Sequence, residues 1–136
     1  MITAIDTNVL LDVFGGDSTF GPRSRDAVEQ CIAEGSLIAC EIVWAEVSAY
    51  FPTTDAAAAA LDRLGVLFSA IDRPAALRAG AAWRAYRTRG GPRTRVVPDF
   101  LIGAHALSQA NRLLTRDARF HRSYFQSLQV LDPSGG

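Results

Sequence analysis

Residues 2–12 read ITAIDTNVLLD, and this stretch decides the fold class. The apolar run from Ile2 to Ile5 has no polar alternation, so it predicts a strand buried on both faces. Asp6 ends this run abruptly, and Thr7 or Asn8 can cap a short apolar helix directly after it. A buried strand that leads straight into a helix is typical of a parallel sheet covered by helices.

Apolar runs and turn residues continue this alternation of strands and helices along the chain. Further strands are expected at residues 37–40, 66–68, 113–114 and 130–131, and further helices at 23–34, 41–50, 56–64, 73–87, 99–111 and 117–124. Apolar strands that alternate with helices predict an α/β fold whose central, mainly parallel sheet has about five strands covered on both faces. The length of 136 residues predicts one domain, residues 1–136.

The charges are balanced overall but divided between the two halves of the chain. Residues 1–72 contain three Arg and eleven Asp or Glu, whereas residues 73–136 contain eleven Arg and three Asp, and Lys is absent. An apolar content of 49% without net charge excludes intrinsic disorder. The basic half predicts contacts with a polyanion, unless these arginines only form solvated helix faces.

The sequence predicts a cytoplasmic protein that does not enter a membrane. The N-terminus lacks the basic residues of a signal peptide, and no apolar run approaches the roughly 20 residues that span a bilayer. Cys31 and Cys40 are the only cysteines, and they are expected as small buried hydrophobes in a reducing compartment. Two cysteines and two distant histidines do not predict a zinc site.

Four acidic residues stand near the ends of expected strands, in largely apolar surroundings. Asp6 and Asp117 follow the first and fourth strands, Glu46 lies in the helix after the second, and Asp99 opens the helix before the fourth. Parallel strands place their carboxyl ends at one edge, so these acids are expected there together. Two carboxylates about 4 Å apart repel by roughly 4 kcal/mol at an effective dielectric of about 20, unless a cation binds or some are protonated. Oxygen ligands without His or Cys favour Mg²⁺ or Mn²⁺, although each acid taken singly could be a cap or turn residue.

Four segments of the chain also fit a known pattern in order and spacing. They are IDTNVLLD at 5–12, WAEV at 44–47, PDFLIGAHA at 98–106 and LTRDARF at 114–120. With these segments the chain resembles the PIN domains, in particular the VapC ribonuclease toxins, over nearly its whole length. The resemblance implies a three-layer α/β/α PIN-like domain.

The resemblance further implies a Mg²⁺-dependent endoribonuclease, with Mn²⁺ as a possible substitute, that hydrolyses RNA phosphodiesters. Its catalytic and metal-binding acids would be Asp6, Glu46, Asp99 and Asp117, with Asp6 and Asp99 as the principal metal ligands. Such an enzyme would be the toxin of a VapBC-type toxin–antitoxin system. It would form a homodimer and be inhibited by a cognate VapB-type antitoxin.

Neighbours of these acids are candidates for binding the substrate. The hydroxyls of Thr7 and Thr115 could hold a water or a phosphate oxygen, or could only cap helices, and Asn8 could orient an acid. Arg116 and Arg119 flank the last acid of the quartet and are the best candidates for bidentate contacts with phosphate. Neither histidine is expected in the site.

Other functions are consistent with parts of this pattern. A catalytically silent PIN-like domain could serve as an RNA-binding or interaction scaffold, although it would be expected to lack one of the four acids. A haloacid-dehalogenase-like phosphatase could use Asp6 as a nucleophile, but it usually has a second Asp where this chain has Asn8. A response receiver needs a Lys at a strand end, and this chain has no Lys.

Overall fold

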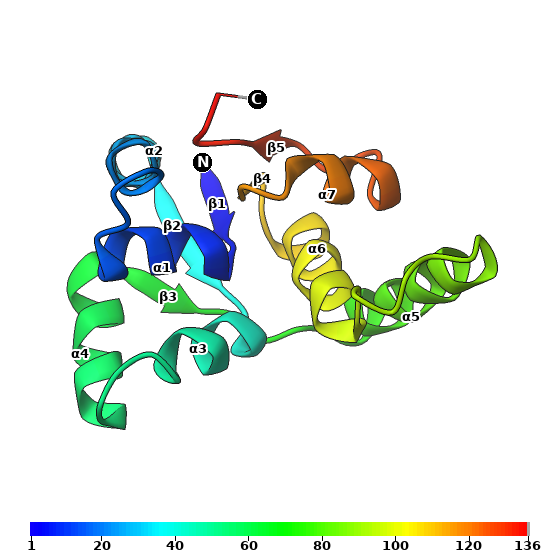
Figure 1. The fold of residues 1–136 in the computed structure, drawn as a ribbon, viewed down its shortest axis with the longest axis horizontal. Helices are drawn as coiled ribbons and strands as arrows, with labels where there is room; N and C mark the ends of the chain where they lie inside the picture. Colours follow the sequence, from blue (N-terminus) through cyan, green and yellow to red (C-terminus); the bar gives the residue numbers. More distant parts are fainter. Residues whose placement is uncertain (136) are drawn as a thin grey trace.

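The computed structural model describes residues 1–135 (Figure 1). Within these residues the chain forms five strands and seven helices. Their order is β1 (Ile2–Ile5), α1 (Thr7–Gly15), α2 (Gly21–Glu34), β2 (Ser36–Ala39), α3 (Glu41–Ser48), α4 (Thr54–Leu64), β3 (Val66–Phe68), α5 (Arg73–Thr88), α6 (Val97–Gln109), β4 (Arg112–Leu114), α7 (Ala118–Tyr124) and β5 (Val130–Leu131).

The five strands form one parallel sheet in the order β3-β2-β1-β4-β5. The central strand is β1, in which Ala4 pairs with Ile38 of β2 on one side and with Leu113 of β4 on the other. The chain adds β2 and β3 on one side of β1 and then β4 and β5 on the other side. The strand order therefore reverses between β1 and β4, and in open α/β sheets the ligand site lies at the carboxyl ends of such strands.

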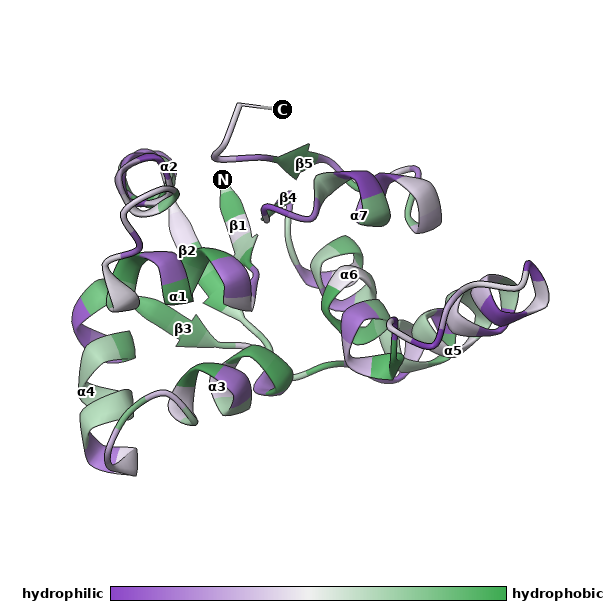
Figure 2. Ribbon diagram, in the orientation of Figure 1, coloured by the Kyte–Doolittle hydropathy of each residue, from purple (hydrophilic) through white to green (hydrophobic). Residues whose placement is uncertain are grey.

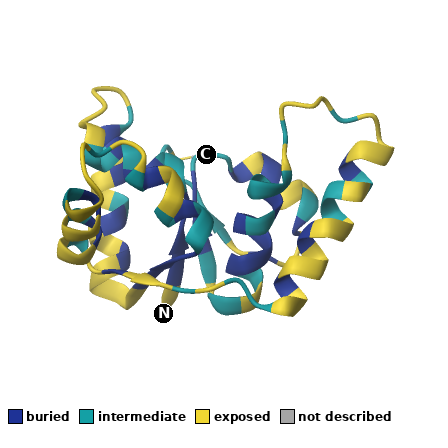
Figure 3. Cartoon of the chain, turned by 90° about the horizontal axis from the view of Figure 1, so that it is seen from below, coloured by how far each residue is buried: buried dark blue, intermediate teal, exposed yellow. Residues whose placement is uncertain are grey.

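Helices cover both faces of the sheet, which gives the three-layer α/β/α arrangement. In Figure 1, α1 and α2 lie on one side of the sheet and α5 and α6 on the other. The strands β1, β3 and β5 are coloured as hydrophobic in Figure 2, and the central strands are largely buried in Figure 3. Ile5, Leu37, Leu113 and Leu114 are almost fully buried, as expected for strands with helices on both faces. The predicted α/β fold with a parallel sheet of five strands is confirmed.

Helix starts differ from the sequence prediction by one or two residues: α2, α4 and α6 begin two residues earlier than expected, and α7 begins one residue later. Asp6 itself caps α1, in place of the expected Thr7 or Asn8, because its carboxylate accepts the backbone N–H of Thr7 at 2.7 Å. Helix α6 begins at Val97, two residues before the expected start, because Pro98 has no N–H to leave unsatisfied and fits the first turn.

The expected burial of Cys31 and Cys40 is confirmed, since both are buried free thiols. Burial raises the pKa of the Cys40 thiol. In the described part of the chain, no helix has the length and apolar character needed to cross a bilayer.

Candidate active site

Asp6 stands at the carboxyl end of the central strand, where its side chain is fixed by hydrogen bonds. It is only 7% exposed. Its Oδ2 accepts the hydroxyl of Thr115 at 2.7 Å and, more weakly, the side-chain amide of Asn8 at 3.5 Å. Thr115 directly follows β4, so this contact joins the ends of β1 and β4 at the point where the strand order reverses.

Glu46 joins the site through Thr7. It is exposed on α3, the helix that follows β2. The hydroxyl of Thr7 donates to Glu46 Oε1 at 2.7 Å. Thr7 therefore contacts two acids, because its backbone N–H donates to Asp6 while its hydroxyl donates to Glu46.

Asp99 and Asp117 share one cation, the guanidinium of Arg95. Arg95 makes a two-pronged ion pair with Asp117, in which Nη2 donates to Oδ1 at 2.9 Å, and its Nη1 lies 3.9 Å from Asp99 Oδ1. The hydrogen bonds to Asp117 raise the pKa of Arg95 above its already high value. Asp99 is also oriented by the backbone N–H of Val96, which donates to its Oδ2 at 3.2 Å. All three charged side chains are about one third exposed, so a solvent ion or ligand can reach them.

One continuous series of contacts links all four predicted acids. The Thr115 hydroxyl connects the Asp6 side of the site to the Asp117 side. It accepts the backbone N–H of Asp117 at 2.9 Å and donates to Asp6. The complete series is Glu46, Thr7, Asp6, Thr115, Asp117, Arg95 and Asp99. The acids line one site without converging on one point: within residues 1–135, no three His, Cys, Asp or Glu side chains lie close enough to hold a metal ion.

His121 belongs to this site, although no histidine was expected there. It is buried, and its Nε2 lies 3.6 Å from Asp6 Oδ2. Its Nδ1 is buried and has no hydrogen-bond partner among the described residues. His105, in contrast, packs away from the acids as expected, with its Nε2 2.9 Å from Ser69 Oγ, and burial lowers its pKa.

The two arginines expected to bind phosphate have different environments. Arg116 makes a two-pronged ion pair with Asp12 at 2.7 and 3.1 Å, and its guanidinium lies 4.0 Å from the centre of the Phe20 ring. Asp12 is buried and also accepts the hydroxyl of Ser24 at 2.8 Å. Arg116 is therefore engaged in the fold, while Arg119 is exposed and makes no ion pair within the described chain.

Sequence spacing could have indicated two residues that were not predicted in the site, His121 and Asp12. His121 lies four residues after Asp117, and Asp12 lies four residues after Asn8, which is the spacing of neighbours on one helix face. Asn8 does act on the site as expected of an orienting residue, since it contacts Asp6 and accepts the backbone N–H of Arg116 at 3.1 Å. Nothing in the local sequence indicates that Arg95 pairs with an acid 22 positions away.

Comparison with known proteins identifies the fold. The family model of the PIN domain matches residues 3–126. VapBC2 from Rickettsia felis, bound to a DNA fragment from its promoter, is 17% identical with a TM-score of 0.74 over 97% of this chain and 98% of that chain. VapBC-1 from nontypeable Haemophilus influenzae is 19% identical with a TM-score of 0.74 over 98% of this chain and 99% of that chain. VapC20 from Mycobacterium tuberculosis, described as a sarcin-ricin loop cleaving toxin, is 15% identical with a TM-score of 0.52 over 82% and 86% of the two chains. No curated protein sequence matches the chain.

Proposed function

The chain belongs to the PIN domain family, and on that basis we propose that it is a Mg²⁺- or Mn²⁺-dependent endoribonuclease. The observation that carries the proposal is the continuous series of contacts that links Asp6, Glu46, Asp99 and Asp117 at the carboxyl edge of the sheet. RNA as the substrate is supported by a neighbour in fold, VapC20, which is described as cleaving the sarcin-ricin loop.

The chemistry of the acids suits a hard divalent cation, although their side chains would have to draw closer together to hold one. All four acids offer carboxylate oxygens, which Mg²⁺ and Mn²⁺ prefer. Asp99 and Asp117 already hold one cationic group, the Arg95 guanidinium, which lies between them. Asp6 and Asp99 would be the principal ligands, with Glu46 and Asp117 completing the set once Arg95 has left Asp117.

In the proposed hydrolysis of RNA, the residues of the site have separate roles. A bound divalent cation would activate a water and neutralise charge on the phosphate oxygens. Thr115 and Asn8 hold the Asp6 carboxylate in one orientation, and Thr7 does the same for Glu46. Freed from Asp117, Arg95 can pair with a phosphate of the RNA, since a guanidinium fork suits phosphate as well as carboxylate.

The proposed biological role is that of a cytoplasmic toxin controlled by an antitoxin. The structural neighbours include VapBC2, VapBC-1 and FitAB, a complex described bound to a DNA fragment. This chain would correspondingly bind a VapB-type antitoxin and form a homodimer. Residues exposed in the isolated chain that suit such contacts include Tyr50, Leu67 and Phe68.

Metal binding and RNA cleavage by matched variants test the enzyme proposal. We expect the parent chain to cleave RNA with Mn²⁺ and not with EDTA. Asp6→Asn and Asp99→Asn should abolish cleavage and weaken Mn²⁺ binding, measured by calorimetry, by at least about tenfold. Asp62→Asn removes an exposed carboxylate on α4 and should match the parent in both measurements.

The alternative function is a silent RNA-binding or interaction scaffold. It is favoured by the ion pair of Arg95 with Asp117, which neutralises part of the acidic site. RNA binding without cleavage, together with equal Mn²⁺ binding by the parent and Asp6→Asn, would support the scaffold and contradict the enzyme proposal.

A further inference from the structure

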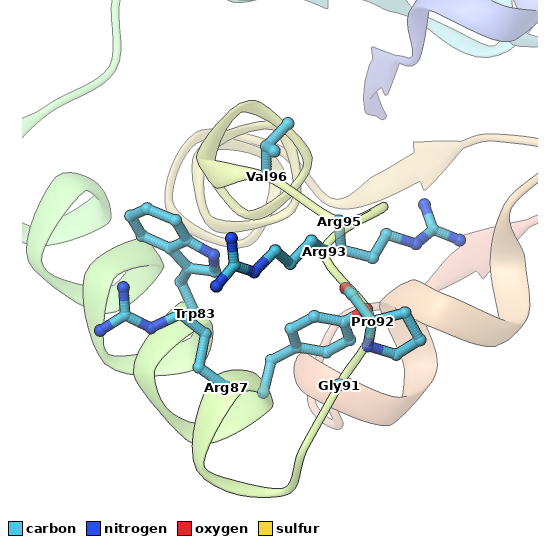
Figure 4. A pocket seen from close by; sticks show the side chains of 8 residues that line it. Trp83, Arg87, Gly91, Pro92, Arg93, Arg95 and Val96 are labelled. Carbon is cyan, nitrogen blue, oxygen red and sulfur yellow. The ribbon is translucent and has the colours of Figure 1, made fainter.

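A pocket of about 570 Å³ lies beside the acidic site, between α5 and the loop that joins α5 to α6 (Figure 4). This size falls in the range of small-ligand pockets. Arg95 lines the pocket and also pairs with Asp117, so the pocket and the acids are direct neighbours. We call it the Trp83 pocket, and its lining residues are Trp83, Tyr86, Arg87, Gly91, Pro92, Arg93, Arg95 and Val96.

The wall of the Trp83 pocket is fixed by Tyr86. This side chain is buried, its hydroxyl donates to the carbonyl of Pro92, and its ring packs against Tyr124 with the centroids 5.6 Å apart. Gly91 lies directly on the ring, because a Cβ at this position would come within 2.5 Å of a Tyr86 ring carbon. The loop is thus held in place over α5, and the pocket exists before any ligand binds.

The lining of the Trp83 pocket combines a flat apolar surface with positive charge. Trp83 is half-buried, and the Arg87 guanidinium lies 4.9 Å from the centre of its ring. Figure 4 shows Arg93 reaching toward Trp83, while Arg95 points in the other direction. The eight lining residues include three arginines and no acid, so the pocket attracts anions.

We propose that the Trp83 pocket binds an unpaired nucleotide of single-stranded RNA, with its base against Trp83 and its phosphates on Arg87 and Arg93. This inference rests on the proposed function, and it names the form of RNA that the enzyme accepts. An aromatic face stacks any base, and guanidinium groups bind the flanking phosphates. A base within a duplex cannot reach such a pocket without leaving its stack, so unpaired RNA is preferred.

The neighbouring acids give the pocket a role in placing the substrate. Within residues 1–135, Arg95 is the pocket-lining side chain that also contacts Asp117. A nucleotide held against Trp83 therefore brings an adjacent phosphodiester toward Asp99 and Asp117. Cleavage is then directed to loops and other unpaired segments of a folded RNA.

Binding of short RNAs in the presence of EDTA tests the pocket without any cleavage. The probes are an eight-nucleotide oligouridylate, a blunt duplex of equal length, and oligouridylates with one abasic nucleotide at successive positions. We expect the parent to bind the single strand more tightly than the duplex, and one abasic position to weaken binding about tenfold. Trp83→Leu should weaken single-strand binding by a similar factor, and Trp83→Phe should restore most of it.

Two variants with the same change in charge distinguish RNA binding in the pocket from general electrostatic attraction of RNA to the basic surface. Arg93→Gln and Arg84→Gln each remove one positive charge, but Arg84 is exposed on α5 outside the pocket lining. Arg93→Gln should weaken binding clearly more than Arg84→Gln. Thermal unfolding of each variant verifies that it is folded.

The outcomes distinguish a failure of the pocket from a failure of the enzyme proposal. If Trp83→Leu and the parent bind the single strand equally well, the pocket does not bind RNA and the inference is wrong. The same result would be obtained if a partner protein were the true occupant of the pocket. The enzyme proposal survives that result if the parent cleaves RNA with Mn²⁺. Binding that depends on Trp83, in a parent that does not cleave, supports the pocket and rejects the enzyme. A parent that binds no single strand contradicts the pocket.

Discussion

The Arg95 guanidinium lies between two acids of the site, hydrogen-bonded to Asp117 and 3.9 Å from a carboxylate oxygen of Asp99. It also lies over the Phe120 ring, with its central carbon 4.2 Å from the ring centre. A divalent cation that uses both acids competes with this side chain. If the proposed cation binds there, Arg95 would be an internal competitor that has to leave Asp117, and its guanidinium would then be free to pair with RNA.

Replacing Arg95 should make the metal bind more tightly. The ion pair is about one third exposed, and an exposed pair contributes at most about 1 kcal/mol. We expect Arg95→Gln to raise Mn²⁺ affinity about fivefold, the equivalent of about 1 kcal/mol, in calorimetry. Arg119→Gln serves as the control, because Arg119 is exposed on α7 and not paired with Asp117. An unchanged or reduced affinity in Arg95→Gln would show that Arg95 does not compete with the cation.

The acids could be predicted from sequence, but their partners could not. A carboxylate at or just after the end of an apolar run marks a strand end, so the positions of Asp6 and Asp117 at strand ends were predictable from local pattern alone. The contacts of Arg95 with Asp117 and of Arg116 with Asp12 span 22 and 104 positions. Such pairings depend on how helices are packed in space, and periodicity carries no information about them.

At the scale of elements, the close approach of α6 and α7 depends on Gly103. A Cβ at Gly103 would lie 2.4 Å from a Phe125 ring carbon and 2.8 Å from His121 Nδ1. The absence of a side chain therefore lets α7 and the residue after it pack against α6. This packing holds His121 next to Asp6.

Two glycine-to-alanine changes in helices should have opposite effects on stability. Gly103→Ala should lower the free energy of unfolding by about 1–3 kcal/mol, because the added carbon overpacks the contact with Phe125. Gly80→Ala in α5 should raise it by up to about 1 kcal/mol, since alanine favours helix and nothing lies within 4 Å of its Cβ. Urea unfolding followed by circular dichroism measures both. A stabilising Gly103→Ala would mean that α7 can move away from α6 at little cost.

The positions of the strands were predictable because each is a short, uninterrupted apolar run, even in β3, where Leu67 and Phe68 are exposed. Strands 66–68 and 130–131 were predicted from such runs with their observed ends. Helix ends were less certain, because caps such as Asp6 and Thr53 depend on which side chain reaches a free N–H. The strand order was not predictable, because it is set by contacts between distant segments.

At the scale of the whole molecule, the two oppositely charged halves are only partly neutralised by each other. Arg112 pairs with Glu34 at 2.6 Å and Arg116 pairs with Asp12, so two arginines of the basic half neutralise acids of the acidic half. Arg95 pairs within its own half, with Asp117. The other eight arginines of residues 73–136 make no ion pair within the described chain.

Affinity for single-stranded RNA should therefore fall steeply with salt. Each phosphate neutralised contributes a slope of about −0.7 to the plot of log affinity against log salt concentration. We expect a slope of about −2 or steeper for the parent, reduced in magnitude by about 0.7 in Arg119→Gln. Arg116→Gln should leave the slope unchanged, because Arg116 is engaged with Asp12. A flat salt dependence in the parent would show that the basic half does not bind phosphate.

The central position of β1 also determines when during synthesis the site can first exist. Asp6 is made before the residue whose hydroxyl orients it, because Thr115 lies 109 positions later in the chain. Strand β1 can pair with β2 early, but its other edge stays open until β4 has emerged and docked. Parallel pairing over such a separation is a slow step in folding. A nascent or truncated chain that ends before β4 holds Asp6 without Thr115 or Asp117, so the complete acidic site appears only after β4 and the residues directly after it have been made.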